Sequence, residues 1–201
     1  MPISVTGRML SEDHFLLDPA NFWRHKNHEM LLAAYGMACR MGLPADLKLV
    51  CTGAPGERRD WLIRAAASMG LAHRVSFPGF VSPAEYRALL GRARGVVFAS
   101  LYEGFGLPLI EAMSSGVPLA CSNTTSLPEV AGEAALLFDP RVPERIAQAM
   151  VALATDEPLR ARLIEAGHRR APAFSHPERM AAEYWGLFRD ALAHREDRAS
   201  S

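Results

Sequence analysis

Lysine and cysteine are scarce in this sequence, and neither sign of charge is in excess. Lys26 and Lys48 are the only lysines, and 22 Lys and Arg residues are balanced by 22 Asp and Glu residues, so the formal net charge is zero. A nucleic-acid-binding protein needs a basic surface to neutralise phosphates, so this balance argues against a nucleic-acid partner. It leaves room for a local anion-binding site built from a few residues.

The cysteine and histidine patterns predict no metal site. Cys39, Cys51 and Cys121 form an odd set without a Cys-x-x-Cys pair, so zinc binding and a disulfide framework are both poorly supported. We interpret them as buried free thiols in a reducing compartment. His25 and His28 are three residues apart on a predicted helix face, but no carboxylate or cysteine completes a site, and the sequence has no Asp-x-Asp pair.

Long apolar runs are also missing. No stretch reaches the roughly 18 apolar residues that a membrane-spanning helix needs, and the first residues lack the apolar centre of a signal peptide. We therefore expect a cytoplasmic protein without a transmembrane segment, for which peripheral membrane contact stays open. The 201 residues, 49% of them hydrophobic, have the composition of one globular domain or two small ones.

Six short apolar segments alternate with helical patterns along most of the chain. They are rich in Val, Leu and Phe without strict alternation of apolar and polar residues, as in strands covered on both faces. The repeated strand–helix–strand order predicts an α/β fold, a Rossmann-like parallel six-stranded sheet with helices on both faces. The predicted strands are Phe15–Asp18, Leu47–Thr52, Arg74–Phe77, Gly95–Ser100, Pro118–Ser122 and Ala134–Phe138.

Serine, proline and glutamate mark the starts of three helices. They stand in the order of a capping box at residues 82–85, 126–129 and 175–178. We divide the chain into an N-terminal linker at residues 1–14, the Rossmann-like domain at residues 15–194 and a disordered tail at residues 195–201. The last part of the domain is predicted to be helical over Val142–Thr155, Pro158–Arg170 and Pro177–His194.

The segment after the fourth predicted strand carries most of the chemistry. Ligands bind at the carboxyl ends of parallel strands, and here Gly104 and Gly106 allow close backbone approach before a helix begins near Pro108. The first amides of that helix form an anion site. Glu103 and Glu111 border it, and carboxylates accept hydrogen bonds from ribose or sugar hydroxyls. From spacing alone, a solvated Glu103 and an ordinary helical Glu111 are equally open.

The two glutamates and their surroundings resemble a known enzyme family. Glu103 and Glu111 stand eight positions apart around Gly-Phe-Gly-Leu-Pro, which resembles the E-x7-E motif of the retaining glycosyltransferases of family 4, the group 1 transferases. The segments at residues 75–81, 98–102, 111–118 and 126–132 resemble the family's sequence in the same order. The resemblance covers roughly residues 15–192.

The resemblance implies half of an enzyme. Members have the GT-B fold, in which a C-terminal Rossmann-like half binds a nucleotide-diphosphate sugar and an N-terminal half binds the acceptor. This chain resembles the C-terminal, donor-binding half, and 201 residues leave no room for both. The implied function is retaining, metal-independent transfer of a hexosyl group from a UDP- or GDP-linked donor, without a further cofactor, in polysaccharide biosynthesis. The donor half alone would be inactive without the acceptor half.

The resemblance also implies roles for individual residues. Glu103 and Lys26 would be the catalytic residues, because Glu103 would face the transferred sugar and Lys26 the diphosphate. Glu111 would hydrogen-bond the ribose. The remaining implied donor-binding residues are Gly104, Phe105, Gly106 and Leu107 at the sugar and diphosphate, and Phe80 and Val81 at the base.

One position departs from the family pattern. Many members carry an arginine five residues before the lysine, where this chain has Asn21. Asparagine can donate a hydrogen bond to the donor but has no charge, so either Lys26 and the helix amides act alone or Arg24 substitutes. Thr125 follows the fifth predicted strand, and it would either touch the donor or cap the next helix.

Three other functions compete with a transferase. The chain could be a nucleotide or nucleotide-sugar binding module without catalytic activity, or a purely structural domain. A nicotinamide-dependent oxidoreductase is disfavoured, because residues 18–21 after the first predicted strand read Asp-Pro-Ala-Asn where a G-x-G-x-x-G fingerprint would be required.

Overall fold

Six parallel strands form the framework of the computed structural model, as the sequence predicts. The structure describes residues 3–5, 8–10, 15–175 and 177–199. All neighbouring strands of this sheet run parallel. The strands are β3 (Phe15–Pro19), β4 (Lys48–Thr52), β5 (Val75–Gly79), β6 (Gly95–Phe98), β7 (Leu119–Ser122) and β8 (Ala135–Phe138).

The strand order creates a crevice in the middle of the sheet. The order is β5-β4-β3-β6-β7-β8, so the chain starts in the middle at β3, builds outward to β5 and then crosses back to β6. The loops that follow β3 and β6 therefore leave in opposite directions. In open α/β sheets, the carboxyl side of this reversal is where ligands bind.

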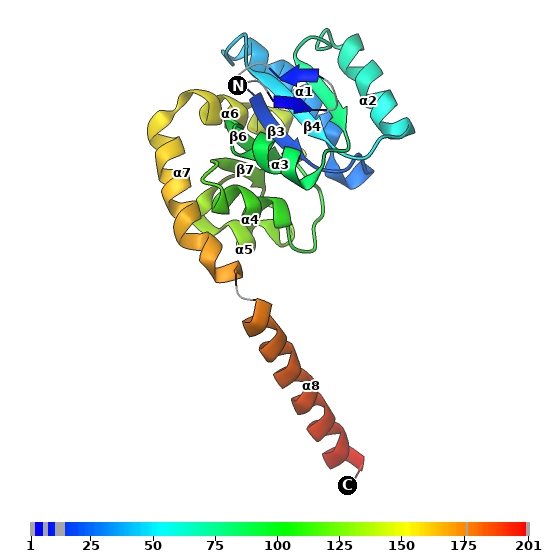
Figure 1. Cartoon of the computed structure of the whole chain (residues 1–201), viewed down its shortest axis with the longest axis vertical. Helices are drawn as coiled ribbons and strands as arrows, with labels where there is room; N and C mark the ends of the chain where they lie inside the picture. Colours follow the sequence, from blue (N-terminus) through cyan, green and yellow to red (C-terminus); the bar gives the residue numbers. More distant parts are fainter. Residues whose placement is uncertain (1–2, 6–7, 11–14, 176, 200–201) are drawn as a thin grey trace.

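Helices cover both faces of the sheet, as predicted (Figure 1). Leu16 and Leu49 point into the core shared with α1, α2 and α6. Leu17 and Val50 point into the opposite core, shared with α3, α4 and α5. The central strands β3 and β4 thus bury side chains on both faces. The helices are α1 (His28–Arg40), α2 (Glu57–Ser68), α3 (Pro83–Leu90), α4 (Leu107–Ser114), α5 (Leu127–Ala131), α6 (Pro143–Thr155), α7 (Glu157–Arg170) and α8 (Pro177–Ala199), with short 3-10 turns η1 (Arg24–Lys26), η2 (Gly132–Ala134) and η3 (Ala171–Phe174).

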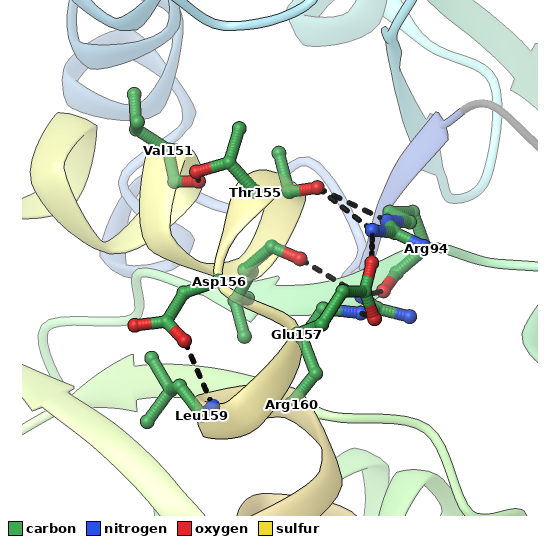
Figure 2. A network of polar contacts seen from close by, with 9 residues as sticks. Arg94, Val151, Thr155, Asp156, Glu157, Leu159 and Arg160 are labelled. Carbon is green, nitrogen blue, oxygen red and sulfur yellow. Dashed lines mark hydrogen bonds and ion pairs between the residues drawn. The ribbon is translucent and has the colours of Figure 1, made fainter.

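An arginine network ties the α6–α7 corner to the amino end of β6 (Figure 2). The guanidinium of Arg94 donates to the carbonyl of Ala154 at 2.9 Å and forms an ion pair with Glu157. Arg160 donates to the carbonyl of Leu153 at 2.8 Å and to that of Arg94, and its Nε lies 3.2 Å from Glu157. This edge of the sheet is therefore closed by internal partners.

Two of the three predicted helix starts can be compared with the structure. Ser82 forms the predicted capping box, since its hydroxyl accepts from the amide of Glu85 at 3.3 Å and the Glu85 carboxylate accepts from the amide of Ser82 at 2.8 Å. At Ser126 the predicted helix start is confirmed, because Ser126 is the N-cap residue of α5, but the predicted capping box is wrong, because its side chain makes no cap. Its hydroxyl donates instead to the carbonyl of Glu103 at 3.0 Å. The third pattern includes residue 176, which lies outside the described residues.

Both ends of the chain contain more secondary structure than the sequence indicates. Within the predicted linker, β1 (Ile3–Val5) and β2 (Arg8–Leu10) pair as an antiparallel hairpin beside α3. At the other end, α8 passes the predicted helix end at His194 and includes residues 195–199 of the predicted disordered tail. The tail is polar, but its Arg, Glu and Ala residues are strong helix formers and extend the preceding helix.

Candidate donor-binding site

The loops that follow β3 and β6 are bonded to each other at the crevice. The amide of Leu101 donates to the carbonyl of His25 at 2.7 Å, and the hydroxyl oxygen of Ser100 lies 3.3 Å from the same carbonyl. Residues that are far apart in the sequence are therefore held as one surface at the carboxyl edge of the sheet.

Lys26 and Glu103, the two predicted catalytic residues, meet on this surface. The ammonium of Lys26 forms an ion pair with Oε1 of Glu103, and the two side chains are only 12% and 13% exposed. The same ammonium lies 5.1 Å from the centre of the Phe98 ring, within cation–π range. The hydroxyl of Ser100 donates to Glu103 at 2.5 Å. A largely buried lysine–glutamate ion pair is thus fixed at the carboxyl edge of the sheet.

The glycine loop leads directly into α4. Gly106 has a φ of 91°, and a Cβ atom there would lie 2.6 Å from Cδ2 of Leu127, so the site requires glycine for both conformation and space. Gly104 and Phe105 are exposed, and the Phe105 ring packs edge-on against Phe174 at 5.8 Å. α4 begins at Leu107; Pro108 has no N–H and the amide of Leu109 donates to the carbonyl of Gly106 at 3.0 Å, so the amide of Leu107 is the candidate donor to an anion at this end of the helix.

The loop after β7 forms hydrogen bonds with the backbone of the loop that follows β6. The hydroxyl oxygen of Thr125 accepts from the amide of Glu103 at 3.1 Å, and Thr124 donates to the carbonyl of Leu101 at 3.4 Å. Thr125 has a φ of 53°, a left-handed conformation that is uncommon outside glycine. Of the two roles open for Thr125, helix capping is absent, because Ser126 is the N-cap residue of α5. Its visible role is to hold the backbone of Glu103.

A pocket of about 250 Å³ opens beside the crevice. Asn21, Phe80, Val81 and Glu111, all predicted donor-binding residues, lie on its wall, whereas Lys26 and Glu103 are not among its lining residues. The residues predicted to form one site therefore divide between this pocket and the Lys26–Glu103 ion pair, and the loop after β3 carries members of both. The other lining residues are Pro19, Ala20, Thr52, Gly53, Ala54, Tyr86 and Pro108.

Sequence reasoning missed Tyr86. Its hydroxyl donates to Oε2 of Glu111 at 2.7 Å, so it orients the second carboxylate of the E-x7-E motif. Burial and the hydrogen bond to Glu111 raise the pKa of Tyr86 well above its ordinary value, which keeps the hydroxyl protonated as a donor. The available signal was its place one turn beyond Ser82, in the helix that follows Phe80 and Val81.

Asn21 organises the pocket wall. Its side-chain oxygen accepts from the amide of Ala54 at 3.0 Å, which links the loop after β3 to the loop after β4. Arg24, the suggested substitute for a clamping arginine, is exposed in η1.

The histidines and cysteines have the following positions. His25 lies in η1 and His28 begins α1, so they do not share a helix face. Over the described residues, no three His, Cys, Asp or Glu side chains gather as a group able to hold a metal ion. All three cysteines are free thiols; Cys51 and Cys121 are buried as predicted, but the prediction is wrong for Cys39, which is only partly buried. Burial raises the pKa of Cys121 to about 12. Among the described helices, none combines the length and the hydropathy needed to cross a membrane.

Comparison with known protein sequences gives one family. Residues 9–170 match the model of the family described as "Glycosyl transferases group 1". O-antigen chain mannosyltransferase B of Escherichia coli is 37% identical over 153 residues, which are 75% of this chain and 39% of that protein. An MMP alpha-(1->4)-mannosyltransferase of Mycolicibacterium hassiacum is 32% identical over 157 residues, 77% of this chain and 38% of that protein. The chain thus spans well under half the length of these relatives.

Solved structures agree with this assignment. Sucrose-phosphate synthase from Thermosynechococcus elongatus superposes with a TM-score of 0.76 at 28% identity, over 92% of this chain and 47% of that one. The C-terminal domain of a group 1 glycosyl transferase (LpcC) from Francisella tularensis superposes with a TM-score of 0.68 at 23% identity, over 79% of this chain and 84% of that domain. The chain belongs to the group 1 glycosyltransferases and has the Rossmann-like fold of the C-terminal half of a GT-B enzyme.

Proposed function

We propose that this chain binds a nucleoside-diphosphate sugar and forms the donor half of a glycosyltransferase. The observation that carries the proposal is that the loop after β3 contributes Asn21 to the pocket wall, which also includes Glu111, and carries Lys26 five residues further on. The pocket suits a base and ribose, with Glu111 accepting hydrogen bonds from the ribose hydroxyls. The diphosphate would extend from the pocket toward Lys26.

The reaction we propose is sugar transfer with retention and without a metal. As the bond to the sugar breaks, negative charge grows on the diphosphate, and fixed positive groups facing it lower the barrier. Lys26 and the amide of Leu107 at the start of α4 would supply such groups. Glu103 faces the transferred sugar once the diphosphate competes for Lys26, and we assign no carboxylate as a covalent nucleophile.

A mannosyl group is the best-supported sugar. The relatives from Escherichia coli and Mycolicibacterium hassiacum are both described as mannosyltransferases. UDP- and GDP-linked donors are both candidates, because Phe80 and Val81 would border the base largely through backbone atoms.

Transfer requires an acceptor-binding half, and α8 supports its presence as a partner. Figure 1 draws α8 standing away from the sheet and its covering helices. Its exposed apolar side chains recur every three to four positions, which is the pattern of a helix that packs on another surface. They are Met180, Tyr184, Trp185, Leu187, Phe188 and Leu192.

The test is a titration of the chain with nucleosides, nucleoside diphosphates and their mannose conjugates, read by calorimetry and by the shift in melting temperature. We expect UDP or GDP to bind more tightly than the matching nucleoside. Absence of binding by both diphosphates would refute the donor assignment. Adding a separately produced acceptor half then separates an enzyme from a non-catalytic binding module, because only the enzyme releases nucleoside diphosphate.

A further inference from the structure

Asp18 and His28 form a buried carboxylate–imidazole pair beneath the candidate site. Each side chain is only 1% exposed, and Nε2 of His28 lies 3.0 Å from Oδ2 of Asp18. Within the described residues, neither side chain has a hydrogen-bonded partner, because the 3.0 Å contact lacks hydrogen-bond alignment. Burying two such groups is unfavourable unless they face each other, so each makes the other tolerable at this position.

The pair joins the two ends of one loop. Asp18 lies near the end of β3, and His28 is the first residue of α1. The loop between them carries Asn21, which lines the pocket, and Lys26, which reaches Glu103. The pair therefore closes the loop that carries the main charge of the candidate site.

The chain between Lys26 and His28 is a single strained residue. Asn27 has a φ of 64°, in the left-handed region. Its side-chain amide donates to the carbonyls of Ala99 at 3.1 Å and Pro140 at 2.9 Å. Such a conformation persists only where the surroundings determine it. Asn27 holds the loop from the β6 and β8 side, and His28 holds it from the β3 side.

The neighbours of the pair leave it little freedom. The Phe22 ring packs against the His28 ring at 5.1 Å, and Cys51 is the partner of Asp18 in the β3–β4 register. Both neighbours are buried. Loss of the pair is therefore expected to shift His28 and the residues joined to it, of which Lys26 is two positions away.

We propose that Asp18 and His28 are positioning residues for the donor diphosphate, because they hold the loop after β3 so that Lys26 faces it. This inference rests on the proposed function. The pair touches neither the pocket nor the diphosphate and acts through Lys26. The alternative interpretation is that the pair only stabilises the packing of α1 on β3 and has no effect on ligand contacts.

The test compares diphosphate with nucleoside binding in three variants. The double variant Asp18→Leu/His28→Leu replaces the pair by apolar residues, a change that buried ion pairs often tolerate without unfolding. His28→Gln keeps a nitrogen donor near Asp18. Glu157→Gln, at the far edge of the sheet, removes a different ion pair and serves as the control. Each variant is titrated with GDP and guanosine, or with UDP and uridine, whichever the unaltered chain binds.

We expect the double variant to lose tenfold or more in diphosphate affinity and less than threefold in nucleoside affinity. His28→Gln should recover most of that loss, and Glu157→Gln should match the unaltered chain. Equal losses for both ligands, or an unchanged ratio, would overturn the positioning role; if the double variant does not fold, the ratio in Asp18→Asn decides in the same way. An unaltered chain that binds no diphosphate would instead refute the proposed function.

Discussion

The two edges of the sheet hold their charged side chains in different ways. At the amino edge, Arg94 and Arg160 end on backbone carbonyls and on Glu157, so their donors are satisfied within the protein (Figure 2). At the carboxyl edge, Lys26 meets Glu103 beside glycine-containing backbone and an open pocket. The same kind of interaction thus closes a corner at one edge, whereas at the other edge we propose that it presents a charge to a ligand.

The comparison shows why an ion pair alone does not identify a site. What separates the two edges is their surroundings, namely the Leu107 amide and Gly106 at one edge and packed helix ends at the other. If the account is correct, substitutions at the carboxyl edge change ligand binding, whereas substitutions at the amino edge change stability alone.

The largest effect is expected for Lys26→Ala. It should weaken UDP or GDP binding by about 2–3 kcal/mol, or roughly 30- to 150-fold, because it removes a charge-assisted contact to the diphosphate. Nucleoside binding should be nearly unchanged. Calorimetry at rising salt checks the cause, because the Debye screening length shortens to about 3 Å at 1 M salt. Added salt should therefore weaken diphosphate binding less in the variant than in the unaltered chain.

Arg24→Ala is the control for Lys26, since Arg24 lies in the same turn and is exposed. If diphosphate binding by Arg24→Ala depends on salt as in the unaltered chain, Arg24 is a surface residue that does not contact the diphosphate. If Lys26→Ala kept the unaltered salt dependence, Lys26 would not face the diphosphate.

A smaller effect is expected for Glu111→Ala. Losing a carboxylate acceptor should weaken nucleoside diphosphate binding by about 1.5–2 kcal/mol. Inorganic diphosphate should bind as before, because it has no ribose. Competition titrations with both ligands check the assignment, and equal losses would contradict a ribose contact.

Tyr86→Phe should act in the same direction as Glu111→Ala but more weakly. It removes the hydroxyl that orients Glu111 and should lower nucleoside and nucleoside diphosphate affinity alike, by about 0.5–1 kcal/mol. The double variant with Glu111→Ala should be no weaker than Glu111→Ala alone. Additive losses in this cycle would show that Tyr86 acts independently of Glu111.

The smallest effect on binding is expected for Glu157→Gln, at the amino edge. The hydrogen bond from Arg94 holds the pKa of Glu157 below its ordinary value. The ion pair therefore stabilises the fold above the unfolded-state pKa of the carboxyl group, and this contribution disappears as the pH falls through the folded-state pKa. Urea unfolding at neutral and acidic pH should show the variant less stable only at neutral pH. A change in nucleotide affinity would contradict a purely structural role.

The sheet could be predicted because its cause is local. The six apolar runs, such as Leu47–Thr52, are long enough for strands and are separated by helix signals such as the capping box at Ser82. The pairing of β1 with β2 could not be predicted from the sequence, because three-residue strands give almost no periodic signal. The end of α8 was missed because polarity was weighed above helix propensity.

The site was predictable only in part. Glu103 and Glu111 share one loop and one helix, so their spacing carries information. The contact of Lys26 with Glu103 spans 77 residues and depends on β3 lying beside β6, which no local pattern determines. The contacts of Tyr86 with Glu111 and of Asp18 with His28 depend in the same way on tertiary packing. Polar side chains that find partners across elements are therefore the part that sequence reasoning misses.

Hydrogen exchange with and without saturating nucleoside diphosphate maps ligand contacts on both edges of the sheet in one measurement. We expect slower exchange in the loop at residues 19–27, at residues 79–86 and at residues 103–111, with no change at residues 92–94 and 155–160. Protection confined to the amino edge, or spread evenly over the chain, would contradict the assignment of the carboxyl edge as the donor-binding site.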